Sequence, residues 1–491
     1  MSIQKVLIAN RGEIAVRILM TLKRLDIHSV IVYHAVDENT PAVNMADEKL
    51  ELYGDLPVAA YLDMDQIIAA CKTTGSDAVH PGFGFLSENA EFVTRLEQEG
   101  MVFIGPSAEV INLMGNKVRA RTFCIENEFP IAPSVVDEGD EEVFISKAKE
   151  IGVPLLIKAA AGGGGKGMQI VRDPEKIEES IALARGEALR SFGDDQVYAE
   201  KYVDEPRHIE VQVLADTHGN ILHLGERECS IQRRFQKIIE EAPSATLTTA
   251  QRENICTTAV SVATKAAYTN AGTVEFIYAP DGEFYFLEMN TRIQVEHPVT
   301  EMVTGIDIVE EQIKVANGQK FSKKQSDIKL EGHAIEVRLY AEDADDGFAP
   351  ATGQLLKYDL PEDDIRVENG FLEGQHVTSA FDPMLAKIIG HGKSRTESIN
   401  KIISALKRST ILGVTTNRDF LIRILEHPAF ASGDTHTGFI PEHAQDLEPV
   451  ASSDEEIQIL LGITAMMSRD LNDEDVKAVE PHITIGDWGN P

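Results

Sequence analysis

The chain has 491 residues, of which 43% are hydrophobic and 26% charged, and its formal net charge is -34 at pH 7. One hydrophobic core rarely serves so long a chain, so we expect about two to four domains or subdomains in a globular protein. The negative charge disfavours nucleic acid and anionic membranes as partners, and no apolar run reaches about 18 residues, which disfavours a membrane span.

The four cysteines, Cys71, Cys124, Cys229 and Cys256, are scattered and form no CxxC pair. This pattern is typical of reduced thiols rather than of a disulfide framework. The first residues enter the apolar segment KVLIAN without the basic and apolar regions of a secretory signal. We therefore expect a cytoplasmic protein.

Residues 1–116 alternate between strand and helix patterns. KVLIAN predicts a buried strand, and the helical spacing of Ile14, Ile18 and Leu22 predicts a helix after it. SVIVYHA and SDAVH predict further strands, the second of which enters the glycine-rich turn PGFGF. This order predicts a parallel sheet with helical crossovers. NAD binding is disfavoured because no GxGxxG follows the first strand.

Residues 117–332 show longer strands and hairpins. VPLLIKAAAGGGGKGMQIV predicts two strands joined by a glycine loop, which consists of Gly162, Gly163, Gly164, Gly165, Lys166 and Gly167. The N–H groups of such a loop can close around phosphate oxygens, and lysine adds charge. It is not a Walker A motif, because Ala160 and Gly167 stand where that motif needs glycine and Ser or Thr. A flexible hairpin tip is the alternative.

Several other polar residues of this part are candidates for a nucleotide site. Lys158 lies in a predicted strand, where a lysine needs a partner or a ligand. Lys117 lies in a predicted helix and by itself would be an ordinary surface lysine. The segment YAEKYVDEPRH offers Glu200, Lys201 and His208 beside a linker whose backbone could bond adenine.

The segment SIQRRFQK concentrates positive charge. Arg233, Arg234 and Lys237 follow Gln232 within a short span. An acidic protein needs such a local cluster to bind an anion. A solvated basic turn is the alternative.

The segment EMNTRIQVEH, residues 288–297, turns polar directly after the apolar run EFYFL. If strand geometry continues, alternate residues share a face. One face then carries Phe286, Glu288, Asn290, Arg292, Gln294 and Glu296, and the other carries Leu287, Met289, Thr291, Ile293 and Val295. The polar face predicts a functional site, with an ordinary solvated strand face as the alternative.

The preceding strand, GTVEFIY, holds a single acid, Glu275. Asp281-Gly282 predicts a two-residue hairpin turn, which would place Glu275 directly opposite Glu288. Facing carboxylates repel each other unless a proton or a cation lies between them. Their oxygen atoms suit Mg²⁺ or Mn²⁺. A coincidental surface pair is the alternative.

The pattern changes again near residue 333. GHAIEVRLY predicts a strand in which Arg338 shares a face with Ala334 and Glu336, where a surface ion pair is the simplest interpretation. Later segments predict a β-rich third part up to residue 445, including a helix at SRTESINKIISALKRSTI. Residues 446–491 form an acidic tail.

Together these segments resemble the biotin carboxylases, a family of ATP-grasp enzymes. The motifs are IANRGEIAVRI, HPGFGFLSEN, IKAAAGGGGKGM, EKYVDEPRHIEVQVL, SIQRR and FLEMNTRIQVEHPVTE, in the family's order and spacing. The resemblance implies an α/β fold with an N-terminal parallel-sheet domain at 1–116, an ATP-grasp domain at 117–332 with a mobile lid at about 131–203, a β-rich C-terminal domain at 333–445 and an acidic tail at 446–491.

The resemblance also implies roles for individual residues. ATP would be bound by Lys117, Lys158, the glycine loop, Glu200, Lys201, Val203, His208 and Gln232. Two Mg²⁺ or Mn²⁺ ions would be bound by Glu275 and Glu288, with Asn290 nearby. Bicarbonate would contact Lys237, Arg292, Gln294 and Val295. Catalysis would use Lys237, Arg292, Glu296 as general base and Arg338, which would stabilise the biotin enolate, with Phe83 also at the biotin.

The implied reaction activates bicarbonate with ATP to carboxyphosphate and then carboxylates biotin. No biotinylation site is found, since the nearest string to AMKM is TAMMSRD, which lacks lysine. We therefore expect a separate biotin carboxyl carrier protein. A carboxyltransferase subunit and a second copy of the chain, in a homodimer, are the other expected partners, in an acyl-CoA carboxylase of the acetyl-CoA or propionyl-CoA type.

Two departures and three alternatives accompany this interpretation. Phe83 stands where a tyrosine is common, and Phe235 where a histidine is frequent. ILGVTTNRDFLIRILEHPAF favours acyl-CoA carboxylase α-chains, but a two-subunit pyruvate carboxylase stays open. An ATP-grasp ligase that joins a carboxylate to an amine would not need RIQVEH or Arg338. An ATP-binding regulatory subunit would be expected to have lost some of the residues Glu275, Glu288, Arg292 and Glu296, yet all four are present.

Overall fold

A computed structural model describes residues 2–137, 139–159, 168–192, 195–234 and 236–449, and in the tail residues 453, 455 and 457–465. The predicted glycine loop, Gly162 to Gly167, and Phe235 lie outside the described residues. The chain divides into two compact units, Met1–Leu447 and Glu448–Pro491. Within the described ranges, no helix combines the length and the apolar composition that crossing a membrane requires.

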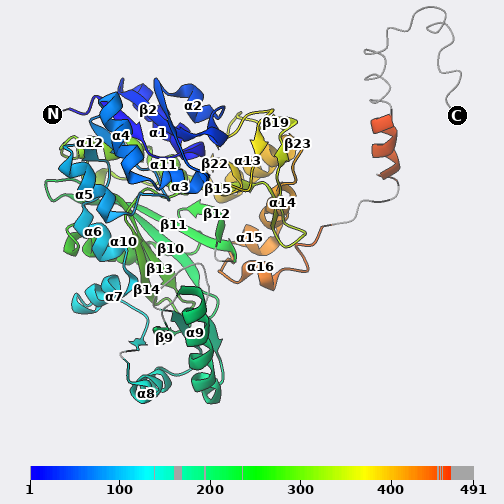
Figure 1. Ribbon diagram of the computed structural model, residues 1–491. Helices are drawn as coiled ribbons and strands as arrows, with labels where there is room; N and C mark the ends of the chain where they lie inside the picture. Colours follow the sequence, from blue (N-terminus) through cyan, green and yellow to red (C-terminus); the bar gives the residue numbers. More distant parts are fainter. Residues whose placement is uncertain are drawn as a thin grey trace, which may run out of the picture. The chain divides into compact units, whose positions relative to one another are not determined.

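The N-terminal part, drawn in shades of blue in Figure 1, contains a parallel sheet. The sheet has five strands in the order β3-β2-β1-β4-β5. The predicted helix is present as α1, and its Ile14, Ile18 and Leu22 are buried. The strands are β1 (Lys5–Ile8), β2 (His28–His34), β3 (Glu48–Leu52), β4 (Ala78–His80) and β5 (Val102–Phe103). The helices are α1 (Gly12–Arg24), α2 (Pro41–Met45), α3 (Pro57–Tyr61), α4 (Met64–Thr74), α5 (Ala90–Gln98) and α6 (Ala108–Met114).

A four-stranded sheet occupies the predicted lid, in the order β6-β9-β7-β8. Its strands are β6 (Ser134–Val136), β7 (Leu155–Ala159), β8 (Gln169–Val171) and β9 (Val197–Lys201), and α8 (Glu141–Ile151) and α9 (Ile177–Phe192) pack on it. Phe144, Leu155 and Ile181 belong to an apolar core made only of residues from this segment. A small sheet with its own core is suited to rigid-body motion, which stays a prediction.

The largest sheet has eight strands, with antiparallel neighbours, in the order β14-β13-β10-β11-β12-β15-β22-β20. Its strands are β10 (Arg207–Ala215), β11 (Ile221–Arg233), β12 (Gln236–Ala242), β13 (Asn270–Tyr278), β14 (Phe284–Asn290), β15 (His333–Tyr340), β20 (Arg366–Asn369) and β22 (Met384–Gly392). Nearby helices are α7 (Lys117–Glu126), α10 (Thr249–Lys265), α11 (His297–Thr304) and α12 (Ile308–Ala316). The sheet thus runs without interruption across the predicted boundary at residue 333.

The remainder of the third part mixes short strands with helices. The strands are β16 (Glu342–Asp343), β17 (Ala349–Pro350), β18 (Gly353–Gln354), β19 (Lys357–Asp359), β21 (His376–Val377) and β23 (Thr410–Leu412). The helices are α13 (Arg395–Arg408), which was predicted, α14 (Arg418–Glu426), α15 (Pro428–Ser432) and α16 (Phe439–Glu442).

The hairpin of β13 and β14 pairs Glu275 with Glu288, as predicted, but the route to that register differs. Its turn has three residues, because Ala279 donates to the carbonyl of Glu283 at 2.8 Å. A bulge then adds one residue to β14, since Phe276 pairs with Phe286 while Glu275 pairs with Glu288. The longer turn and the bulge compensate each other.

Two expectations about residues 286–296 were wrong. Phe286 does not share the polar face; it packs with Met289 in the apolar core, because the bulge reverses the alternation between them. The strand ends at Asn290, and residues 291–296 form a loop that leads into α11. A loop, rather than a strand face, therefore carries Gln294 and Glu296.

Candidate active site

A buried ammonium group lies at the centre of the polar residues. Lys237 of β12 donates to Glu210 at 2.5 Å, to Glu275 at 3.0 Å and to Glu296 at 2.7 Å. Burial alone would lower the pKa of Lys237, but the three carboxylates raise it well above its usual value. Because an ammonium has three N–H donors, each carboxylate receives one.

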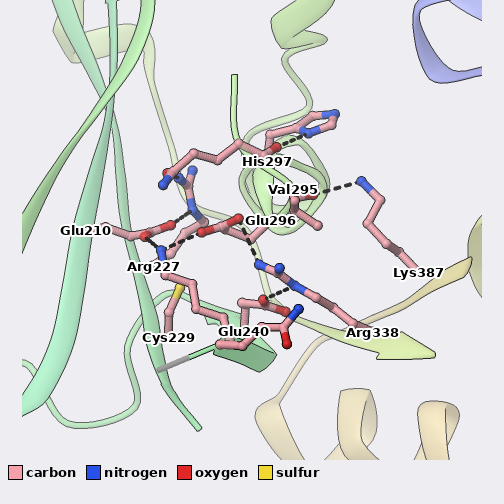
Figure 2. A network of polar contacts seen from close by, with 12 residues as sticks. Glu210, Arg227, Cys229, Glu240, Val295, Glu296, His297, Arg338 and Lys387 are labelled. Carbon is pink, nitrogen blue, oxygen red and sulfur yellow. Dashed lines mark hydrogen bonds and ion pairs between the residues drawn. The ribbon is translucent and has the colours of Figure 1, made fainter. Parts of the chain in front are cut away.

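Arg227 of β11 lies next to this centre and is fully buried. It donates to Glu210 at 2.5 Å (Figure 2). It also donates to Gln294 at 2.8 Å and to Thr300 at 3.0 Å. These bonds join the sheet to the 291–296 loop and to α11. Neither Arg227 nor Glu210 was predicted from the sequence. Glu210 lies in a largely apolar strand, which is the signal that identified Glu275, whereas Arg227 stands between Glu226 and Glu228 and has no such signal.

Glu275 is surrounded by donors. One of its oxygens accepts from Asn290 at 2.8 Å and from Gln294 at 2.6 Å, in addition to Lys237. The other lies 2.8 Å from Nε2 of His208. Glu288, directly opposite, is 38% exposed, and the ammonium of Lys117 is 4.0 Å from it. The structure therefore brings the three predicted metal-binding residues together.

The two facing carboxyl groups have pKa values displaced in opposite directions. Burial tends to raise both, but Lys237 and His208 outweigh it and lower the pKa of Glu275. Burial and the charge of Glu275 raise the pKa of Glu288. Ionising both groups at once calls for another cation, and a set of carboxylate and amide oxygens fits Mg²⁺ or Mn²⁺.

Arg338 of β15 is buried, with 7% exposure, so the surface ion pair considered from sequence is wrong. It donates to Glu240 at 2.6 Å and to Glu296 at 3.1 Å (Figure 2). Burial would raise the pKa of Glu296, but Lys237 and Arg338 together lower it well below its usual value. Glu296 is therefore a carboxylate at neutral pH. Glu240 was not predicted.

Arg292 points to a different set of partners. It donates to Glu88 at 3.0 Å, to the side-chain oxygen of Asn290 at 3.0 Å and to the carbonyl of Ile293 at 3.2 Å. Glu88 also accepts from the backbone of Thr291 at 3.0 Å. The loop is thus attached to the N-terminal part through an acid that sequence analysis did not identify.

The predicted nucleotide residues fall into two groups. Lys158 and Glu200 form an ion pair of 2.5 Å inside the four-stranded sheet, and Arg121 also donates to Glu200 at 3.4 Å. In the large sheet, His208 lies beside Glu275, and the side-chain nitrogen of Gln232 is 3.2 Å from Nδ1 of His208. Lys201, which is exposed, and Val203, which is half-buried, lie at the connection between β9 and β10.

The basic cluster and Phe83 are placed partly as expected. Of the cluster, Lys237 enters the buried centre, whereas Arg233 pairs with Glu342 and stacks over Phe348 at 4.9 Å. Arg234 has a positive φ of 46° and forms the turn between β11 and β12. Phe83 is half-buried against the N-terminal core, and its proximity to biotin stays a prediction.

Three known families match consecutive segments of the chain. They are the biotin carboxylase N-terminal domain at residues 2–111, the carbamoyl-phosphate synthase L chain ATP-binding domain at 116–324 and the biotin carboxylase C-terminal domain at 336–442. Biotin carboxylase 1 of Bacillus subtilis is 46% identical over 89% of this chain and 98% of its own length. The chain belongs to the biotin carboxylase family.

Other relatives are similar over the same region. The α subunit of mitochondrial methylcrotonoyl-CoA carboxylase from mouse is 45% identical over 92% of this chain, and the chain spans 64% of that relative's length. The biotin carboxylase domain dimer of Hydrogenobacter thermophilus 2-oxoglutarate carboxylase, solved with MgADP, ADP and bicarbonate, has a TM-score of 0.87 and 42% identity. That likeness covers 92% of this chain and 100% of the domain.

Proposed function

We propose that this chain carboxylates biotin on a separate carrier protein, using ATP and bicarbonate. The observation that carries the proposal is the meeting of Lys237, Glu296 and Arg338 beside the facing carboxylates. An ATP-grasp ligase for a carboxylate and an amine would use the facing acids, but it would leave the buried contact between Arg338 and Glu296 without a role.

ATP and metal binding are assigned to the exposed side of this centre. Glu275 and Glu288, with Asn290, would hold Mg²⁺ or Mn²⁺, and the bound ion would supply positive charge to offset that of the phosphates. Lys117, Lys158 and the glycine loop bind the phosphates. Glu200, Lys201, Val203, His208 and Gln232 bind the adenosine. The sheet that carries Lys158 closes over the nucleotide, which excludes water from carboxyphosphate.

Bicarbonate binds against Lys237, Arg292, Gln294 and the backbone of Val295. Glu296 is ionised and accepts the proton that bicarbonate loses as its oxygen attacks the γ-phosphoryl group. Arg338 then faces the ureido oxygen of biotin, where negative charge develops during carboxylation, with Phe83 beside the biotin. The buried position of Arg338 supports this role, since its charge is already desolvated and oriented.

The carboxyl group is passed on by a carboxyltransferase subunit, and we propose acetyl-CoA or propionyl-CoA as the acceptor. The likeness to a methylcrotonoyl-CoA carboxylase subunit supports an acyl-CoA. Pyruvate is the second candidate, because the likeness to a 2-oxoglutarate carboxylase domain supports a 2-oxo acid. A homodimer and a cytoplasmic location stay predictions.

The test supplies the purified chain with ATP, Mg²⁺, free biotin and labelled bicarbonate. We expect ADP release that depends on bicarbonate, together with acid-labile label on biotin. The proposal would be contradicted if the rate of ADP release did not depend on bicarbonate, or if no label were incorporated into biotin. Purifying the native complex and identifying its carboxyltransferase subunit would then decide the acceptor.

A further inference from the structure

Two successive peptide carbonyls of the 291–296 loop are bound by buried side chains. The carbonyl of Gln294 accepts from Nδ1 of His297 at 2.7 Å. The carbonyl of Val295 accepts from the ammonium of Lys387 at 2.8 Å. In Figure 2, Lys387 approaches Val295 from the side opposite Glu210 and Arg227.

The direction of these carbonyls fixes the direction of two amides. In a planar trans peptide, the N–H points opposite to the C=O of the same unit. The N–H of Val295 therefore points away from His297, and that of Glu296 points away from Lys387. Among the contacts of the described residues, neither amide has an acceptor. Successive N–H groups at a turn form a concave site for an anion.

His297 is built as a donor to one carbonyl. It is fully buried, and burial, reinforced by the charge of Lys387, lowers its pKa well below the usual value, so the ring is neutral. Because its Nδ1 faces a carbonyl, that nitrogen carries the proton. Its Nε2 has no hydrogen-bond partner among the described residues.

Lys387 lies in β22 with no exposed surface and forms an ion pair of 2.6 Å with Glu368 of β20. An apolar residue would avoid the cost of burying such a pair. Its neighbour across the sheet is Arg338, which contacts Glu296. Cations on adjacent strands thus hold consecutive residues of one loop.

We propose that Lys387 and His297 are positioning residues, which orient the two peptide units so that the amides of Val295 and Glu296 face bicarbonate. The inference rests on the proposed function, which places bicarbonate at this loop. Neither residue touches the substrate. Their effect is to keep the two amides in place before the anion arrives.

The first test compares Lys387→Met with Lys401→Met. Lys401 is the control, because it also donates to a backbone carbonyl, that of His391, at 2.8 Å and has an acid, Glu397, at 3.4 Å. His391 lies near the end of β22, away from the 291–296 loop. Lys387→Met should raise the KM for bicarbonate about 10- to 100-fold, because the amides that bind the anion lose their orientation. The KM for MgATP should change less than about twofold. Lys401→Met should change neither.

The second test compares His297→Asn with His297→Leu, and it stands even if Lys387→Met does not fold. The asparagine amide can donate in place of Nδ1, whereas leucine cannot. His297→Asn should keep the KM for bicarbonate within about threefold, and His297→Leu should raise it about 10-fold or more.

Two outcomes would overturn the inference. The first is that Lys387→Met and His297→Leu lower the melting temperature but leave the KM for bicarbonate unchanged. The second is that they raise both KM values equally. Wild-type protein without bicarbonate-dependent ATP cleavage would instead overturn the proposed function, and this inference with it.

Discussion

Several glutamates face each other across the eight-stranded sheet, and two of these pairs are stabilised in different ways. Glu275 and Glu288 pair across β13 and β14, and Glu240 and Glu336 pair across β12 and β15. The first pair has amide, imidazole and ammonium neighbours and is open to solvent at Glu288. In the second, neither oxygen of Glu336 has a hydrogen-bond partner within the described structure, and Glu240 is bound by Arg338.

The difference shows how each pair avoids the repulsion of two charges. Burial raises the pKa of Glu240 to about 7, although Arg338 opposes the shift, and it raises that of Glu336 well above the usual range. A proton therefore stabilises Glu240 and Glu336, the inner pair. A metal ion is expected to stabilise Glu275 and Glu288, the outer pair. Facing carboxylates alone do not define a metal site; the surrounding donors and the access to solvent do.

The largest effect is expected at the outer pair. Glu288→Gln should lower Mg²⁺-dependent ATP cleavage about 1000-fold or more, because one oxygen ligand and its charge are lost. The fold should be intact, since glutamine resembles the protonated carboxyl. Glu336→Gln is the matched control and should keep cleavage within about threefold, because Glu336 has no described hydrogen bond to lose. If both variants lost ATP cleavage to the same extent, the proposal that only the outer pair binds metal would be wrong.

Arg338 tests the link between the inner pair and catalysis. Arg338→Gln should lower biotin carboxylation about 100- to 1000-fold, since a preorganised charge at the reacting group is lost. Bicarbonate-dependent ATP cleavage should be largely spared, because phosphoryl transfer depends on the outer pair. Both activities are measured on free biotin with protein of matched stability. If the variant lost both activities to the same extent, Arg338 would have a structural rather than a catalytic role.

Nucleotide binding should affect the two regions unequally. With MgATP at about ten times its Kd, amide exchange in β7 and β8 should slow about tenfold as the small sheet closes. Exchange in β12 and β15, which carry the inner pair, should change much less. If β7 and β8 exchange at the same rate with and without nucleotide, the lid prediction is wrong.

The smallest effect concerns pH. The carboxyl of Glu240 has a pKa near 4.5 in the unfolded chain, and burial raises this pKa to about 7 in the folded protein. Its stabilising contribution is therefore complete below pH 4.5, declines as the pH rises to about 7 and is absent above. The melting temperature of wild type minus that of Glu240→Gln should fall over this window and be constant at higher pH. A difference that does not vary with pH would falsify the proton-stabilised interpretation.

Much of the fold follows from local patterns. The helical spacing of Ile14, Ile18 and Leu22 and the order of strands and helices predicted the N-terminal parallel sheet. The facing of Glu275 and Glu288 was also predicted, although from a two-residue turn that the structure lacks. A longer turn and a bulge cancel each other, and no local pattern reveals such a cancellation, because a bulge depends on packing against the partner strand.

The site was predicted in part. Lys237, Glu296 and Arg338 were singled out, and the structure brings them into contact. Glu240, Glu88 and Lys387 were missed, because their importance lies in partners far away along the chain. Lys387, for example, binds a carbonyl 92 residues earlier. The lone charge of Lys387 in the apolar pattern of β22 marks this residue as buried, but its partner appears only in three dimensions.

The uninterrupted pairing of β12 with β15 has a consequence for dissecting the molecule. A fragment that ends at residue 332 would leave the backbone groups of β12 without their neighbour strand. Such an open edge recruits other chains, so the fragment should aggregate rather than fold as a soluble nucleotide-binding module. The same argument applies to recombination between homologues. A chimera joined at this point must match residues 236–242 to the incoming strand, or it loses solubility before catalysis can be measured.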